Sequence, residues 1–421
     1  MIAYETAQLI IKQKALERSL PTEYVPVEKS MGRVTSEAIC SPKNSPPFDN
    51  SAMDGFAISS ALTAAASEKN PLFFSILASI AAGESIGKTI KSNSDLPFAV
   101  EIMTGAPIPR HLHVNAVIKM EEVEQIEGQK IILRRPVLAE ENIRLAGGDI
   151  QKSECLLTHG IFLGPEHIMA LTSVGIASVP VFKKPRIAVI STGKELAPHG
   201  EANLADGCIY NSTAPYLISA ISMLGASAHF YGSVSDDAEC FTNLLKIILQ
   251  DKPDLIISTG AVSMGKHDFL RAALEKMNAE ILFHKVAIRP GKPMLFAQMP
   301  AEEKNLGALF LGFPGNPVPA ATGVRFFLEP YLRILYGLNA EKPILAHVIN
   351  RMEKPKALRC FFKANFVFHE NQVQVRLLAG QESFKIKPLL YADAWAVLPE
   401  GKQFIEENDL VETFPFYASR K

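Results

Sequence analysis

The sequence predicts a multidomain protein of α/β and β class, built around a doubly wound, mostly parallel sheet. The chain has 421 residues, which is too long for one domain at roughly 150 residues per domain. Strand and helix patterns alternate between residues 183 and 335, as in a parallel sheet with crossover helices. The flanking segments instead carry short apolar runs between Gly, Pro and Asn, which favours small β-rich modules on either side.

The first half begins with a helical pattern over residues 1–20, followed by a proline-punctuated stretch. Residues 46–55 combine prolines, small residues and two acids, which is typical of a rigid loop. Short apolar runs between about 55 and 140 predict a β-rich module. Helical spacing returns at 166–174, where Gly175 provides a stop signal.

The α/β region is predicted from strands that each end in a glycine-containing loop, at 186–191, 254–258 and 308–311. Between them, helices are expected over 214–224, 236–250 and 268–277. Asn316 suits a helix N-cap, and Pro317 suits the first helical position. Beyond residue 336 the apolar runs are short again, which predicts a terminal β-barrel or sandwich.

The charge composition argues against nucleic acid and anionic membranes as partners. Lys and Arg number 43 against 44 Asp and Glu, so no net positive field is present to hold nucleic acid or an anionic membrane. Any anion site must therefore be local. The N-terminal stretch carries charges throughout, unlike a signal peptide, and other apolar runs fall short of the ~20 residues that span a bilayer. We expect a cytoplasmic protein with neither a nucleic-acid nor a membrane partner.

The cysteines are five in number, scattered, and never spaced as CxxC. This usage is typical of a reducing compartment and predicts neither a disulfide framework nor a structural zinc site.

Three strand-end loops predict a ligand crevice. Each follows an expected strand, and the carboxyl ends of strands in an open α/β sheet form the binding edge. Glycine there lets backbone N–H groups approach a phosphate, and a helix N-terminus adds partial positive charge. We therefore expect a small anionic ligand that bears phosphate, although the same loops also suit simple tight turns. The loops are Ser191-Thr192-Gly193, Ser258-Thr259-Gly260 and Pro314-Gly315-Asn316-Pro317.

A basic loop follows at residues 285–293, where two prolines and a glycine stiffen the chain around Lys285, Arg289 and Lys292. Such cations would bind phosphate or an oxyanion such as molybdate. The alternative is a solvated surface loop.

Carboxylates gather near the same strand ends and in two glycine-rich loops of the first half. Hard cations such as Mg²⁺ prefer carboxylate and phosphate oxygens, so these acids predict a metal bridge to the ligand. For any single residue among them, a helix cap or a solvated charge is the alternative. The acids are Glu195, Asp236, Asp237 and Asp268 in the α/β region, with Asp54 and Asp149 in the first half.

Seven motifs occur in a fixed order over almost the whole chain. They are PPFDNSAMDG (46–55), IMTGAPIP (102–109), NIRLAGGDI (142–150), STGKEL (191–196), STGAVSMGKHDF (258–269), KVAIRPGKP (285–293) and FPGNPV (313–318). In this order they resemble the molybdopterin molybdenumtransferases, which include the bacterial MoeA proteins and the E domains of gephyrin and its plant counterpart.

The resemblance implies a cytoplasmic enzyme that completes molybdenum cofactor. It would take adenylylated molybdopterin, bind molybdate, insert the metal at the dithiolene and release AMP with the help of Mg²⁺. It also implies an elongated homodimer, with the upstream adenylyltransferase and molybdoenzyme apoproteins as further partners. The expected four parts are 1–45 with 141–182 as an N-terminal helix and elongated linking domain, 46–140 as a β-rich module, 183–335 as a molybdopterin-binding domain resembling the adenylyltransferase fold, and 336–421 as a small β-barrel.

The resemblance also assigns roles by motif position. The expected catalytic residues are Asp54, Asp149, Glu195, Asp268, Lys285, Arg289 and Lys292. The expected substrate-binding residues are Ser191, Thr192, Gly193, Ser258, Thr259, Gly260, Ser263, Pro314, Gly315 and Asn316. The expected Mg²⁺ ligands are Asp236, Asp237 and Asp268.

The chain departs from the family pattern at several site positions. Lys194 and Asn211 replace acids, Gly148 replaces a glutamate, and Ala261 replaces a glycine, whereas Arg289 preserves the charge of a lysine. The lost acids weaken the expected metal site and leave open a noncatalytic protein that binds or carries molybdopterin or molybdenum cofactor. An adenylyltransferase is a second alternative, but such an enzyme would not need the first 180 or the last 85 residues.

Overall fold

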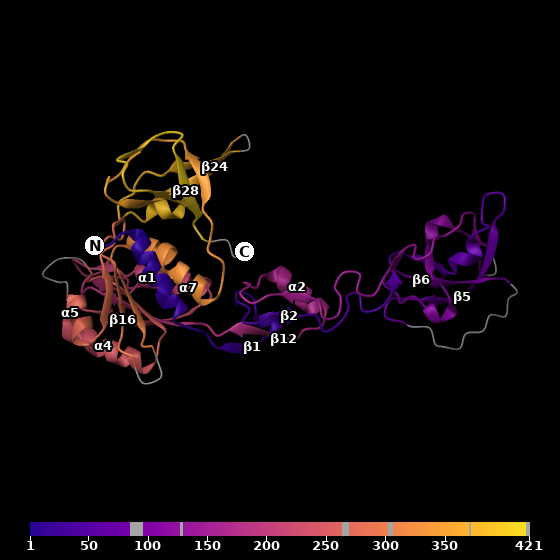
Figure 1. Cartoon of the computed structure of the whole chain (residues 1–421), viewed down its shortest axis with the longest axis horizontal. Helices are drawn as coiled ribbons and strands as arrows, with labels where there is room; N and C mark the ends of the chain where they lie inside the picture. Colours follow the sequence, from indigo (N-terminus) through magenta and orange to yellow (C-terminus); the bar gives the residue numbers. More distant parts are fainter. Residues whose placement is uncertain (85–95, 127–128, 263–268, 302–305, 370–371, 418–421) are drawn as a thin grey trace.

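The computed structural model describes residues 1–84, 96–126, 129–262, 269–301, 306–369 and 372–417. Its parts lie along one long axis (Figure 1). A central α/β domain and a C-terminal barrel stand together at one end, a small middle part follows, and a distal β module forms the other end.

The central domain contains a six-stranded sheet in the order β16-β13-β17-β21-β20-β18. The first four strands run parallel, and β20 and β18 complete the sheet through antiparallel pairings. The expected mostly parallel sheet is therefore confirmed. In chain order, the strands are β13 (Arg186–Thr192), β16 (Ser227–Val234), β17 (Leu255–Thr259), β18 (Glu280–His284), β20 (Leu295–Gln298) and β21 (Leu309–Phe313).

Helices cover both faces of this sheet, because the strand residues alternate between two cores. In β13, Val189 packs in the core that contains α3, while Ile190 packs in the core that contains α4 and α5. This is the doubly wound arrangement. The helices are α3 (Thr213–Met223), α4 (Ala238–Gln250), α5 (Phe269–Lys276), α6 (Pro317–Gly323), the π-helix η5 (Val324–Leu328) and α7 (Glu329–Leu335). In the part of the chain that the structure describes, no helix is long and apolar enough to cross a membrane.

The first helix, α1 (Tyr4–Leu16), packs against α7. Its buried residues Ala7, Ile11 and Ala15 recur every four positions, so they form one apolar stripe that joins the core of the central domain. The family resemblance groups this helix with the linking domain. The structure places it on the central domain instead, because α7 offers the apolar surface that the stripe needs.

The middle part combines two chain segments. Strand β1 (Thr22–Pro26) pairs with β12 (Ser178–Phe182), and β2 (Ile39–Cys40) pairs with β11 (Cys155–Leu157). Helix α2 (Pro165–Ser173) covers a small core of its own.

Two chain passes, residues 41–46 and 147–154, connect the middle part to the distal module, and we call them the neck (Figure 1). They hydrogen-bond to each other, for example from Ser45 N–H to Ile150 O at 2.8 Å.

The distal module contains a six-stranded sheet in the order β7-β4-β6-β5-β9-β8, with a core on each face. In β4, Phe56 and Ile58 enter one core and Ala57 enters the other, as strand alternation requires. The β-rich module is thus present. Its strands are β4 (Gly55–Ile58), β5 (Leu72–Ile80), β6 (Phe98–Ile102), β7 (Ala116–Lys119), β8 (Glu124–Ile126) and β9 (Lys130–Leu133), and β3 (Asn50–Ser51) pairs with β10 (Ile143–Arg144) beside them.

The C-terminal part is a closed barrel and not a sandwich, because β24 pairs with both β25 and β26. It rests on the central domain through Phe361, which stacks on Phe326 of η5 with ring centroids 4.1 Å apart. The barrel strands are β22 (Ile344–Val348), β24 (Arg359–His369), β25 (Gln372–Leu377), β26 (Ala394–Leu398) and β28 (Leu410–Pro415), and β19 (Ile288–Arg289) pairs with β24 from outside.

Candidate active site

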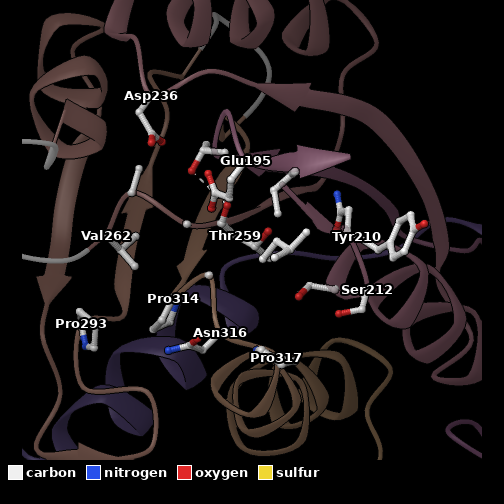
Figure 2. Close-up of a pocket in the computed structure, with 18 residues that line it drawn as sticks. Glu195, Tyr210, Ser212, Asp236, Thr259, Val262, Pro293, Pro314, Asn316 and Pro317 are labelled. Atoms are coloured by element: carbon white, nitrogen blue, oxygen red, sulfur yellow. Dashed lines mark hydrogen bonds between the residues drawn. The ribbon is translucent and has the colours of Figure 1, made fainter. Parts of the chain in front are cut away.

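A pocket of about 420 Å³ opens at the carboxyl ends of the parallel strands (Figure 2). Three of its walls are the loops after β13, β17 and β21, which are neighbouring strands of the sheet. A fourth wall comes from the start of α3. The lining residues are Thr192, Glu195, Leu196, Ile209, Tyr210, Asn211, Ser212, Thr213, Asp236, Thr259, Gly260, Ala261, Val262, Pro293, Pro314, Gly315, Asn316 and Pro317.

The three predicted strand-end loops meet here because β13, β17 and β21 are adjacent parallel strands. Six of the expected substrate-binding residues line the pocket, namely Thr192, Thr259, Gly260, Pro314, Gly315 and Asn316. Ser191 and Ser258 are fully buried and do not line it. Gly193 lies outside the lining too, and Ser263 falls outside the described residues.

Gly260 shows why one of these loops needs a glycine. Its φ is +94°, and a Cβ there would lie 2.5 Å from the backbone oxygen of Thr192 and 2.4 Å from its Oγ1. No side chain fits that space, so the backbones after β13 and β17 approach each other closely. The next residue, Ala261, adopts the left-handed region as well, with φ +50°, where an alanine is strained.

Asn211 occupies a position where the family pattern has an acid. Its Nδ2 donates to Ser191 Oγ at 2.9 Å, and its Oδ1 accepts from Ala214 N–H at 3.1 Å. The amide therefore ties the start of α3 to β13 and uses both a donor and an acceptor, which a carboxylate could not do.

Two carboxylates lie on the same side of the pocket (Figure 2). Glu195 follows β13 and Asp236 follows β16, and these strands are neighbours. Asp237 has a different role. Its Oδ1 accepts from the N–H groups of Glu239 and Cys240 at 3.0 and 2.8 Å, so it caps α4, and these bonds lower its pKa.

These acids fit a magnesium site in which the substrate and water supply most of the ligands. Mg²⁺ is commonly held by one or two protein carboxylates together with substrate phosphates and waters. Glu195 and Asp236 supply two carboxylates to the pocket lining, whereas no cluster of three or more metal-ligating side chains occurs among the described residues. Asp268, the third expected ligand, lies outside the described residues.

The basic loop lies at the edge of the pocket. Pro293 lines it, and His284 Nε2, just before the loop, is 3.4 Å from the backbone oxygen of Val262 in the pocket wall. Arg289 and Lys292 are exposed and Lys285 is half-buried; none of the three lines the pocket. The loop therefore places its cations beside the site, where an anion that extends from the pocket could meet them.

The first three motifs converge at a second place, where the neck joins the distal module. Asp54 Oδ1 accepts from both the N–H and the Oγ1 of Thr104, each at 2.7 Å, and these bonds lower the pKa of Asp54. Asp49 Oδ1 accepts from Ala146 N–H at 2.8 Å, and its other oxygen pairs with Arg110. Residues 46–55, 102–109 and 142–150 thus share one hydrogen-bonded cluster.

The expected catalytic residues are therefore divided between two places. Asp54 lies in this cluster, and Asp149 is exposed in the neck, where its N–H donates to Ser45 O at 3.0 Å. Figure 1 shows the distal module at the opposite end of the molecule from the central sheet. One chain does not bring Asp54 or Asp149 to the pocket that contains Glu195.

Sequence reasoning also missed residues near the pocket. Ser383, from the barrel, accepts from Asn316 Nδ2 through its Oγ at 3.1 Å and from Val318 N–H through its backbone oxygen at 3.2 Å. No local pattern marks this serine, because its proximity depends on how the barrel docks. Tyr210, Ser212 and Thr213 were also missed, although polar residues just before an expected helix are a usable signal.

Comparison with known families identifies two matching regions. Residues 2–175 match the model described as "MoeA N-terminal region (domain I and II)", and residues 188–334 match the one described as "Probable molybdopterin binding domain". A protein of Synechococcus elongatus named "Molybdopterin molybdenumtransferase" is 34% identical over 98% of this chain and 99% of its own. One of the same name from Bacillus subtilis is 32% identical over 93% of this chain and 89% of its own.

Solved structures agree over the full length. A molybdopterin biosynthesis MoeA protein of Pyrococcus horikoshii superposes with a TM-score of 0.80 at 28% identity and covers 100% of both chains. A second structure from the same organism gives a TM-score of 0.79 at 26% identity and covers 98% of this chain and 99% of its own.

Proposed function

The chain belongs to the MoeA family of molybdopterin molybdenumtransferases, and we propose that it inserts molybdenum into adenylylated molybdopterin and releases AMP. The observation that carries the proposal is the pocket at the carboxyl ends of β13, β17 and β21. Its walls combine a glycine-permitted close approach, two carboxylates and a neighbouring basic loop, which suits an anionic ligand that bears a pyrophosphate.

Each group has a role in this proposal. The backbone around Gly260 and Gly315 would let the pyrophosphate lie close to the chain, and the first turn of α3 adds amide donors. Lys285, Arg289 and Lys292 would bind phosphate or molybdate at the edge of the pocket. Glu195 and Asp236 would hold Mg²⁺, which when bound offsets the charge that develops on the AMP leaving group.

We further propose a cytoplasmic homodimer whose sites are shared between subunits. Asp54 lies in the cluster with Thr104 and Asp149 lies in the neck, and neither lines the pocket of its own chain. If they act together with Glu195, a second copy must bring its distal module and neck to that pocket. The upstream adenylyltransferase and molybdoenzyme apoproteins are the further partners that fit this activity.

Mixed dimers test the shared site. A chain with Asp54→Asn and a chain with Glu195→Gln are each expected to be inactive. In a mixed dimer, one site combines the intact pocket of the first chain with the intact distal module of the second, so activity returns. Inactive mixed dimers would contradict a site in which Asp54 of one subunit acts together with Glu195 of the other.

The activity itself is tested by AMP release from adenylylated molybdopterin with purified protein and Mg²⁺, with and without molybdate. Molybdate-dependent release supports the transferase and shows that Gly148, Lys194 and Asn211 are tolerated. Tight binding without release supports the alternative of a noncatalytic carrier, which the replaced acids favour.

A further inference from the structure

Two cysteines face each other in the middle part. Cys40 of β2 and Cys155 of β11 are direct partners in the antiparallel ladder, so their side chains project from the same face. Both residues are exposed, and both are free thiols. Neither belongs to the pocket or to the cluster around Asp54.

The two cysteines form a non-hydrogen-bonded pair of this ladder, next to a bulge between Cys155 and Leu157. Ser41 N–H donates to Glu154 O at 2.8 Å, so the hydrogen bond joins the residues next to the cysteines and not the cysteines themselves. Such non-hydrogen-bonded pairs have Cα atoms about 4.5 Å apart. That separation lies within the range of about 4.4–6.8 Å that disulfides span.

The side chains are also close. Desolvation and then the neighbouring Cys40 thiol raise the pKa of Cys155 above its ordinary value. The Cys155 thiolate, which is the reactive form, becomes more abundant as the pH rises.

We propose that Cys40 and Cys155 form a redox-modifiable dithiol that small disulfides such as oxidised glutathione convert to an intramolecular disulfide. One cysteine thiolate attacks a glutathione sulfur, expels one glutathione thiolate and forms a mixed disulfide. The second cysteine thiolate then attacks the protein sulfur and expels the other glutathione. The protein loses two protons and two electrons, and oxidised glutathione becomes two thiols.

The position of this pair gives the disulfide a mechanical effect. Residues 40 and 155 lie in the middle part directly next to the neck, and everything between them, including the distal module, forms one loop (Figure 1). A bond there ties the outgoing pass to the returning pass at the base of the neck. It therefore suppresses opening of the hydrogen bonds across the neck, such as that from Ser41 N–H to Glu154 O.

The chemistry is tested by incubating the full chain with mixtures of reduced and oxidised glutathione, followed by acid quenching, alkylation and peptide mass spectrometry. We expect a linked Cys40–Cys155 peptide pair two hydrogens lighter than the reduced peptides. Cys240 is exposed on α4 and serves as the internal control, because it is expected to acquire only a glutathione adduct. Separate adducts on Cys40 and Cys155, or no modification at ratios that modify Cys240, would overturn the proposal.

Two variants separate pairing from general reactivity. In Cys155→Ser, Cys40 is expected to accumulate as a glutathione adduct because no second thiol resolves it, while Cys240→Ser should form the linked pair like the parent. A stable adduct on Cys40 in the parent as well would contradict resolution by Cys155.

Hydrogen exchange tests the mechanical effect without reference to activity. In the oxidised protein, the amides of Ser41, Ser45 and Ser153 are expected to exchange several-fold more slowly than in the reduced protein. Amides of β7 in the distal module should be unchanged. Equal exchange at the neck in both states would show that the disulfide forms without bracing it.

Discussion

Asn316 Nδ2 donates a hydrogen bond to Ser383 Oγ at 3.1 Å, and this contact joins the strand-end loop after β21 to the C-terminal barrel. Asn316 occupies the N-cap position of α6, but its side chain makes no capping bond. The backbone oxygen of Ser383 instead accepts from Val318 N–H in the first turn. The barrel thus contacts one wall of the pocket through a residue that lies 67 positions away in the sequence.

Replacing Ser383 with alanine tests this contact. The Oγ acceptor is lost while the backbone bond to Val318 remains, so Asn316 becomes less restrained. The expected cost is about 0.5–1.5 kcal/mol in substrate binding, seen as a raised KM with kcat little changed. Ser219→Ala is the matched control, because that hydroxyl bonds within its own helix to Pro215 O. A variant with the KM of the parent would show that Asn316 does not need the barrel.

Strained backbone at the pocket gives a second prediction. Ala261 has φ +50°, which costs an alanine about 1–2 kcal/mol, and a glycine there would remove most of that cost. Glycine also adds freedom to the unfolded chain, worth about 0.4–1 kcal/mol. Ala261→Gly is therefore expected to stabilise the protein by about 0.5 kcal/mol in urea unfolding.

Asn278→Gly provides the comparison, because Asn278 has a similar φ of +59° but asparagine tolerates that region. We expect little stabilisation there. If Ala261→Gly destabilised the protein as much as an ordinary alanine-to-glycine change, the strain argument would fail.

Sequence reasoning predicted the pocket because its signals are local. Thr192 and Thr259 end their strands and Gly315 follows one, and parallel strands place their carboxyl ends at one edge whatever the details of packing. The same logic could not place Ser383, whose position depends on barrel docking. Nor could it show that Asp54 lies in the cluster with Thr104 and not at the pocket, because a motif gives residue types and no distances between them.

Helix α1 shows the same limit. Its periodicity predicted a helix correctly, but an apolar stripe does not say which surface will cover it. The apolar surface that covers the stripe belongs to α7, whose residues come more than 300 positions later. Sequence reasoning therefore predicted the elements and the shared strand edge, and it did not predict contacts between parts.

Thr104 provides a third prediction, at the second cluster. Its hydroxyl and its N–H both donate to Asp54 Oδ1 and lower the pKa of that carboxyl. Thr104→Val removes the hydroxyl donor, so the pKa of Asp54 is expected to rise and the acidic limb of the pH–rate profile to move to higher pH. Thr104→Ser keeps the donor and should retain the parent profile. Identical profiles for the valine and serine variants would dissociate this hydroxyl from the state of Asp54.

A buried carboxylate predicts how stability depends on pH. Burial raises the pKa of Glu329 from 4.5 to about 7, although Arg325 opposes this with a bond of 3.1 Å to Glu329 Oε2. Between these values the folded state binds more protons than the unfolded chain, so this group makes stability fall as the pH rises from about 5 to 7. Glu329→Gln removes that titration.

Urea unfolding at pH 5 and pH 7 measures the effect. The midpoint is expected to fall less between these values in Glu329→Gln than in the parent. Glu275→Gln, at an exposed glutamate bonded to Arg271, should follow the parent. Equal pH dependence in all three proteins would mean that Glu329 keeps an ordinary pKa.

Lys292 tests whether the basic loop serves the pocket. The side chain is exposed, and the loop is anchored at the pocket edge by Pro293, so the ammonium group is available to an anion. Lys292→Ala is expected to weaken binding of molybdate or of the nucleotide substrate by about 1–3 kcal/mol, the scale of a charge-assisted hydrogen bond. Titration calorimetry at low salt measures this directly, because added salt screens an exposed cation. Lys246→Ala, at an exposed lysine on α4 away from the pocket, removes the same charge and controls for net charge alone. Equal affinities in the two variants would remove Lys292 from the site and leave the loop as a solvated surface feature.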